Sequence, residues 1–202
     1  IFSPWPLRLD AMITVAAFFW VVPTLFLMFA IAFAAVGWHP NGTKSARWAA
    51  LGFLTAAAGS IFDTQRTYLP PMFNTLATPA HWIAVYALLQ SILVRHDQHI
   101  ARIPLLIWAV TSLSAHIFLV TFNHPLPDRV LLMNITVPVI MAMAFVPMLR
   151  SRKRPIDTVL VWLVGGAIIT YPLRIAMFVI QDQARELLGP YAWSQYSIIF
   201  YL

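Results

Sequence analysis

Apolar residues occur in runs long enough to cross a bilayer, and short polar stretches separate these runs. A hydrocarbon core of ~30 Å needs about 20 mostly apolar residues in one helix. The sequence therefore predicts an all-α integral membrane protein, a bundle of about seven transmembrane helices. We expect the spans at residues 10–37, 46–62, 78–94, 103–122, 129–149, 157–180 and 191–202, with the seventh truncated at the last residue.

The polar breaks carry turn-forming residues, as in the stretches HPNG (39–42), LPP (69–71), HPLP (124–127) and LGP (188–190). Prolines also fall inside the expected spans, where neighbouring helices and water can satisfy the freed backbone carbonyls. No fixed repeat and no flexible linker divides the chain. We therefore expect residues 1–202 to form a single transmembrane helical domain.

Composition excludes a soluble globular domain, because 60% of the residues are apolar and 10% are charged, against about 25% charged in ordinary soluble domains. The net charge of +6 comes from thinly spread basic residues, which does not favour nucleic-acid binding. The absence of cysteine excludes disulfides, thiolate metal sites and cysteine catalysis. The lipid bilayer is therefore the first partner that the sequence predicts.

The basic residues gather in alternate loops, and this asymmetry predicts the orientation of the chain. Cytoplasmic loops of membrane proteins carry an excess of Lys and Arg. The expected N-terminus is therefore outside and the C-terminus cytoplasmic. The eight residues that mark the cytoplasmic face are Lys44, Arg47, Arg95, Arg102, Arg150, Arg152, Lys153 and Arg154.

Arg174 is the strongest candidate for a functional residue, because it falls inside the sixth expected span. Ionisable side chains within a membrane are costly and commonly mark functional sites. One interpretation makes Arg174 the anchor of an anionic ligand. The other has it reach outward to the interface or pair with an acidic residue such as Asp63.

The other polar candidates fall in the expected outer half of the bundle, which predicts a polar vestibule open to the outside. Such a pocket would favour a small polar or anionic ligand. Two alternatives stay open: the polar side chains can simply join helices, and histidines on neighbouring helices can bind haem. The candidate ligand-binding residues are Arg174, His116, Asn134, His81, Arg66, Tyr171 and Asn74.

Several site classes find no support in the sequence. Both lysines, Lys44 and Lys153, fall in loops, which excludes the retinal Schiff base of rhodopsins. His96 and His99 lie in a charged loop without enough further ligands, so we interpret that loop as solvated. We expect no catalytic residue and no metal site in this chain.

The chain resembles the multi-span N-terminal membrane region of bacterial diguanylate cyclases, the GGDEF-domain signalling proteins. The similar stretches are LD (9–10), SARWAALGF (45–53), RVLLMN (129–134), SRKRPID (151–157) with the arginine before it, and YPLR (171–174), within residues 9–180. The resemblance implies a multi-pass protein of the bacterial inner membrane, working as a homodimer. It also implies a following cytoplasmic domain that uses Mg and joins two GTP molecules into cyclic di-GMP.

The GGDEF signature itself does not occur in these residues, so the resemblance transfers no catalytic residue and no cofactor. GTP and Mg are expected only for the missing cyclase domain. The leading hypothesis is a sensory domain that perceives an extracytoplasmic or membrane-dissolved cue. The alternatives are an integral-membrane scaffold or subunit without a ligand of its own and, more remotely, a small transporter or haem-binding enzyme.

Overall fold

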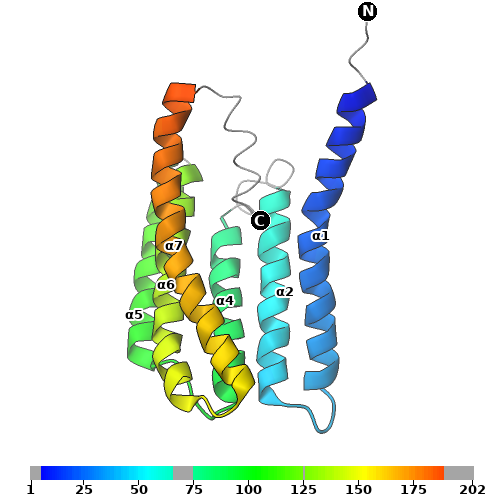
Figure 1. Ribbon diagram of the computed structural model, residues 1–202, viewed down its shortest axis with the longest axis vertical. Coiled ribbons are helices and arrows are strands. Elements are labelled where there is room, and N and C mark those ends of the chain that lie inside the picture. Colours follow the sequence, from blue (N-terminus) through cyan, green and yellow to red (C-terminus); the bar gives the residue numbers. More distant parts are fainter. Residues whose placement is uncertain (1–5, 66–74, 125, 189–202) are drawn as a thin grey trace, which may run out of the picture. The chain divides into compact units, whose positions relative to one another are not determined.

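The structure, a computed structural model, describes residues 6–65, 75–124 and 126–188, and within them the side chains of residues 20–65, 75–124 and 128–176. This part of the chain is all-helical and contains no strand. Figure 1 shows its long helices. They are α1 (Pro6–Gly37), α2 (Lys44–Thr64), α4 (Ala77–Val94), α5 (Arg102–Thr121), α6 (Leu126–Ser151) and α7 (Pro155–Leu188).

Five of the described helices are long and apolar enough to cross a membrane, which confirms the expected all-α, multi-pass membrane class. The membrane-length stretches are Trp20–Gly37, Ala77–Val94, Arg102–Thr121, Asp128–Ser151 and Pro155–Ala176. Helix α2 is not among them, because small residues and charged residues lower its mean hydropathy. The expected seventh span lies outside the described residues, so the number seven and the placement of the termini stay predictions.

Four prolines lie beyond the first turn of described helices, and the helices continue through them: Pro23 in α1, Pro138 and Pro147 in α6, and Pro172 in α7. Helices α1 and α7 also extend beyond the expected spans, beginning at Pro6 and ending at Leu188 respectively. The apolar run thus predicts the membrane-length core of each helix and not its ends.

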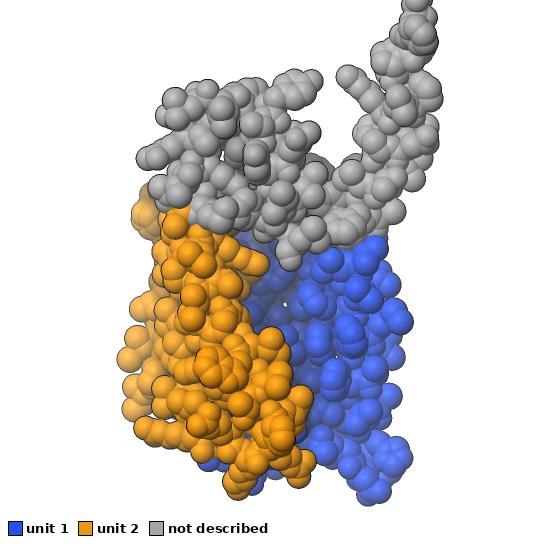
Figure 2. All heavy atoms as spheres, in the orientation of Figure 1, with its two compact units in different colours: residues 1–101 blue, residues 102–202 orange. Residues whose placement is uncertain are grey.

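The chain divides into two compact units, residues 1–101 and 102–202, coloured separately in Figure 2. In the first unit α2 packs against both α1 and α4. In the second unit α6 packs against both α5 and α7. The expectation of a single domain stays a prediction, and each unit is described here by itself.

Close packing in the first unit depends on small residues of α2. A Cβ atom added at Gly52 would lie 2.7 Å from Leu88 Cγ, and one added at Gly59 would lie 2.9 Å from the His81 ring. Helix backbones approach this closely only where side chains are absent or small. The other buried residues of α2 are all alanines: Ala46, Ala49, Ala50, Ala56 and Ala57.

An aromatic cluster joins α1 to α2. The ring of Phe53 lies 5.2 Å from that of Phe29 and stacks on Phe33 at 5.6 Å, with Phe26 at 6.2 Å. Aromatic pairs at such centroid distances contribute about 0.5–1.5 kcal/mol beyond the area that they bury. Helix α1 therefore contacts α2 through bulky aromatic rings, whereas α4 packs closely against the glycines of α2.

The second unit buries fewer small residues and exposes more large apolar ones. Ile103 and Trp162 are each 74% exposed, and residues of this kind run along α5 and α7. On a soluble protein such a surface would promote aggregation, whereas acyl chains solvate it in a bilayer. The exposure follows from a membrane environment and not from poor folding.

Two helices end in the same backbone motif. After α4, the amides of Asp97 and Gln98 donate to the carbonyls of Val94 and Leu93, and Asp97 has a φ of 54°. After α5, Asn123 has a φ of 52°, and its amide and that of His124 repeat the pattern. These are Schellman motifs, in which the left-handed position is usually glycine and sometimes asparagine.

Candidate functional site

The clearest polar contact between described helices joins α2 to α4. His81 Nε2 donates a hydrogen bond to Asp63 Oδ2 at 2.9 Å. Asp63 and Gly59 are four residues apart and so share one face of α2, and the ring of His81 lies over Gly59. The missing side chain at Gly59 leaves the space that brings the imidazole to the carboxylate.

This contact gives His81, a candidate ligand-binding residue, a partner on the neighbouring helix. Its partner Asp63 is the acidic residue that the sequence offered as a possible partner of Arg174. Arg66 and Asn74 lie outside the described residues. The His81–Asp63 pair therefore fastens the two helices where α2 ends and α4 begins.

Further polar contacts hold the opposite end of the first unit. Ser45 Oγ donates to the Ser91 carbonyl at 2.7 Å, and Arg47 Nε donates to the Gly37 carbonyl at 2.7 Å. The buried amide of Gln90 donates to His99 Nδ1. His99 thus belongs to a structural contact at the end of α4, and sequence reasoning did not find this role.

In the second unit four of the candidates lie in the half of the helices away from the α6–α7 turn: His116, Asn134, Tyr171 and Arg174. Counted from the α6–α7 turn at 1.5 Å per residue, Asn134 lies about 26 Å along α6 and Arg174 about 28 Å along α7. His116 lies about 8 Å from the end of α5, which is joined to the start of α6. The polar candidates of α5, α6 and α7 therefore lie in the same half of the unit.

His116 and Asn134 differ in how deeply they are buried. His116 is buried, with 3% of its surface exposed. Asn134 is half-buried, and its Nδ2 donates to the Val130 carbonyl within α6 at 3.0 Å. That bond lies within one helix, whereas a contact between helices was the expected alternative.

Arg174 is exposed, and its guanidinium carbon lies 5.6 Å from the ring centroid of Tyr171, one turn earlier in α7. A cation within about 6 Å of an aromatic ring is attracted to its face. The exposed guanidinium therefore lies beside the Tyr171 ring.

A buried hydrogen bond between α5 and α6 comes from a residue that was not among the candidates. Trp108 Nε1 donates to the Thr136 carbonyl at 2.9 Å, and this contact is buried. The indole N–H must find an acceptor when it is buried, and only the packing of α5 against α6 shows which one. The sequence identified Trp108 as an apolar residue of the span and gave no signal of this bond.

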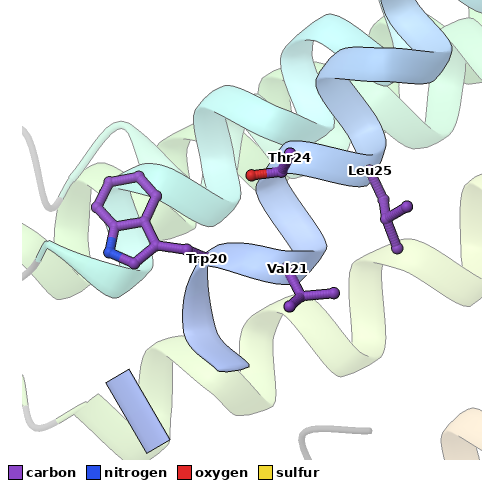
Figure 3. A pocket seen from close by; sticks show the side chains of 4 residues that line it. All are labelled: Trp20, Val21, Thr24 and Leu25. Carbon is purple, nitrogen blue, oxygen red and sulfur yellow. The ribbon is translucent and has the colours of Figure 1, made fainter. Parts of the chain in front are cut away.

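The structure also contains an open apolar hollow of about 280 Å³ on α1 (Figure 3). Its lining side chains are Trp20, Val21, Thr24 and Leu25, all from the same helix. The polar atoms among them are the Thr24 hydroxyl and the Trp20 indole nitrogen (Figure 3). This hollow is not the polar vestibule that the sequence predicted, and it suits an acyl chain better than an anion.

The described residues contain no group of three or more His, Asp or Glu side chains that could hold a metal ion. Comparison with protein-family models, with curated proteins and with solved structures finds no match. The function must therefore be argued from the chain itself.

Proposed function

We propose that this chain is the membrane sensory domain of a bacterial diguanylate cyclase. In this proposal it spans the inner membrane seven times, with the N-terminus outside and the C-terminus in the cytoplasm. It perceives an extracytoplasmic or membrane-dissolved cue, works as a homodimer and regulates a cyclase domain that follows it. GTP and Mg would serve that domain and not this chain.

The observation that supports a sensory site is the shared level of Asn134 and Arg174 in the second unit, with His116 toward the same end. An accessible guanidinium beside the Tyr171 ring provides a positive charge and an aromatic face for a small anion. A ligand can change the output only if it binds one arrangement of the helices better than another. Helix α7 would transmit such a change, because it carries Arg174 and continues to Leu188.

The direct test replaces Arg174 with alanine in the full reading frame and measures cyclic di-GMP in cells. The matched control is Leu173→Ala, because Leu173 is the neighbouring exposed residue of α7 and carries no charge. A panel of small carboxylates and inorganic phosphate is then tested for thermal stabilisation of the purified chain. We expect Arg174→Ala, and not the control, to lose both stabilisation and regulation. Unchanged output and unchanged stabilisation would overturn the role of Arg174.

The orientation can be tested with single cysteines, because the natural sequence contains none. In intact cells a membrane-impermeant maleimide should label Asn123→Cys, which lies after α5. It should label Lys153→Cys, in the α6–α7 turn, only after lysis. The reverse pattern would contradict the proposed topology.

The second candidate function is an integral-membrane scaffold or subunit. The bonds that favour it are those of Trp108 to the Thr136 carbonyl and of Asn134 to the Val130 carbonyl, since both serve helices of the chain itself. The reading frame after Leu202 distinguishes the two functions. A GGDEF domain there supports the sensor, whereas its absence together with co-purification of a stable membrane partner supports the scaffold.

A further inference from the structure

The turn between α6 and α7 concentrates positive charge in a small space. Helix α6 ends at Ser151 and α7 begins at Pro155, so the connection consists of residues 152–154. Four of the five positions from 150 to 154 are basic, and all four side chains are exposed: Arg150, Arg152, Lys153 and Arg154.

The acidic residue nearest to this cluster is directed away from the surface. Asp157 is buried, with 3% of its surface exposed, and its Oδ2 accepts the backbone amides of Lys153 at 3.2 Å and Arg154 at 3.0 Å. The carboxylate therefore fixes the backbone of the turn while the basic side chains stay outside. It also occupies these amides, which would otherwise be available to an anion at the start of α7.

The depth of the turn in the bilayer follows from the helices on either side. The membrane-length stretches Asp128–Ser151 and Pro155–Ala176 leave a connection of three residues between them. Such a connection must lie at the level of the lipid headgroups, because it is too short to extend far into water. Clusters of four or more Lys and Arg next to a membrane helix attract anionic lipids.

We propose that the α6–α7 turn is a binding site for the headgroup of an anionic phospholipid. Arg152, Lys153 and Arg154 hold the phosphate through their side chains, and Asp157 holds the turn in shape. A phospholipid fits better than a soluble anion, because the bilayer presents its headgroups at the depth of the turn. This site is independent of the sensory role of Arg174.

The test uses the full chain in detergent and measures apparent Kd values by native mass spectrometry. The probes are phosphatidylglycerol, phosphatidylcholine and inorganic phosphate. The test variant is Arg152→Gln/Lys153→Gln, and the charge-matched control is Lys44→Gln/Arg102→Gln, which removes two exposed basic residues elsewhere. The thermal unfolding of both variants in phosphatidylcholine establishes that they fold.

We expect the natural chain to prefer phosphatidylglycerol. Each basic residue near the headgroup contributes about fivefold to the affinity, so the test variant, which lacks two, should lose about 25-fold while its affinity for phosphatidylcholine is unchanged. The control should keep most of the preference. The proposal is wrong if both variants lose affinity equally, if the natural chain shows no preference, or if inorganic phosphate displaces the lipid at comparable concentration. A test variant that fails to fold is replaced by Lys153→Gln alone, for which about a fivefold loss is expected.

Discussion

The two units of this protein hold their helices together by different means. In the first unit, glycines and alanines of α2 bring it close to α4, and hydrogen bonds fasten both ends of the contact. In the second unit, large apolar side chains face outward, and the buried bond of Trp108 joins α5 to α6. Close packing leaves little room for rearrangement, because a core without voids does not deform gradually. We therefore expect the helices of the first unit to tolerate less rearrangement than those of the second.

The largest expected effect tests the close packing of α2. The Cβ of Gly52→Ala would lie 2.7 Å from Leu88 Cγ and 3.1 Å from the Leu88 backbone nitrogen. Overpacking of this kind costs roughly 1–3 kcal/mol. The measurement is the free energy of unfolding from an SDS titration in mixed micelles.

Gly166→Ala in α7 is the matched control, because its added Cβ meets no atom within 4 Å. It should be neutral or stabilise the chain by up to about 1 kcal/mol through helix propensity. Equal destabilisation by both substitutions would remove the proposed contrast between the units.

The next effect concerns the His81–Asp63 pair, measured as a double-mutant cycle of alanine substitutions. Polar contacts between membrane helices have coupling free energies of about 0.6 kcal/mol on average and up to about 1.7 kcal/mol. The exposed fraction of the Asp63 side chain, 40%, places the pair in the lower half of that range. The closeness of the two helices at Gly59 should keep the coupling measurable.

The comparison pair is His124 Nδ1 and Asp128 Oδ2 in the second unit. Its atoms are also 2.9 Å apart, and its residues are four positions apart in the sequence. Exposed pairs of this spacing contribute about 0.3–0.5 kcal/mol. If its coupling equals or exceeds that of His81 and Asp63, the fastening of α2 to α4 by the latter pair is contradicted.

Trp108→Phe should destabilise the second unit by about 0.5–1.5 kcal/mol, because it removes the donor to the Thr136 carbonyl and keeps most of the aromatic surface. The same SDS titration measures the loss. Trp162→Phe is the control, since Trp162 is 74% exposed and should change stability little. An equal effect of the two substitutions would show that the hydrogen bond contributes nothing.

The smallest effect concerns the left-handed residues that end α4 and α5. Asp97→Gly should stabilise the chain by about 0.5 kcal/mol or less, because glycine relieves the positive φ but also raises the entropy of the unfolded chain. Asn123→Gly should gain less, since asparagine tolerates this conformation better. Thermal unfolding of both variants checks the order, and a larger gain at Asn123 would contradict it.

The sequence by itself determined the class of the protein, because the thickness of a bilayer dictates how long an apolar run must be. It placed the membrane-length helices and the turns between them. It did not distinguish α2, which is not among the helices apolar enough to cross a membrane, from the other expected spans. The glycines and alanines of α2 are visible in the sequence, but the sequence does not specify the side chains that they pack against.

Only the tertiary structure decided which groups meet. Asp63 and His81 are eighteen residues apart, and Trp108 and Thr136 are twenty-eight apart. Contacts over such separations depend on the rotation of each helix about its axis, which lipid-facing residues specify weakly because a bilayer accepts any apolar side chain. The burial of Asp157 at the basic turn was likewise decided by the structure. Its carboxylate accepts the backbone amides of Lys153 and Arg154, which precede it in the sequence. Hydropathy fixed the environment of each helix, and the packing of neighbouring helices fixed the role of each polar side chain.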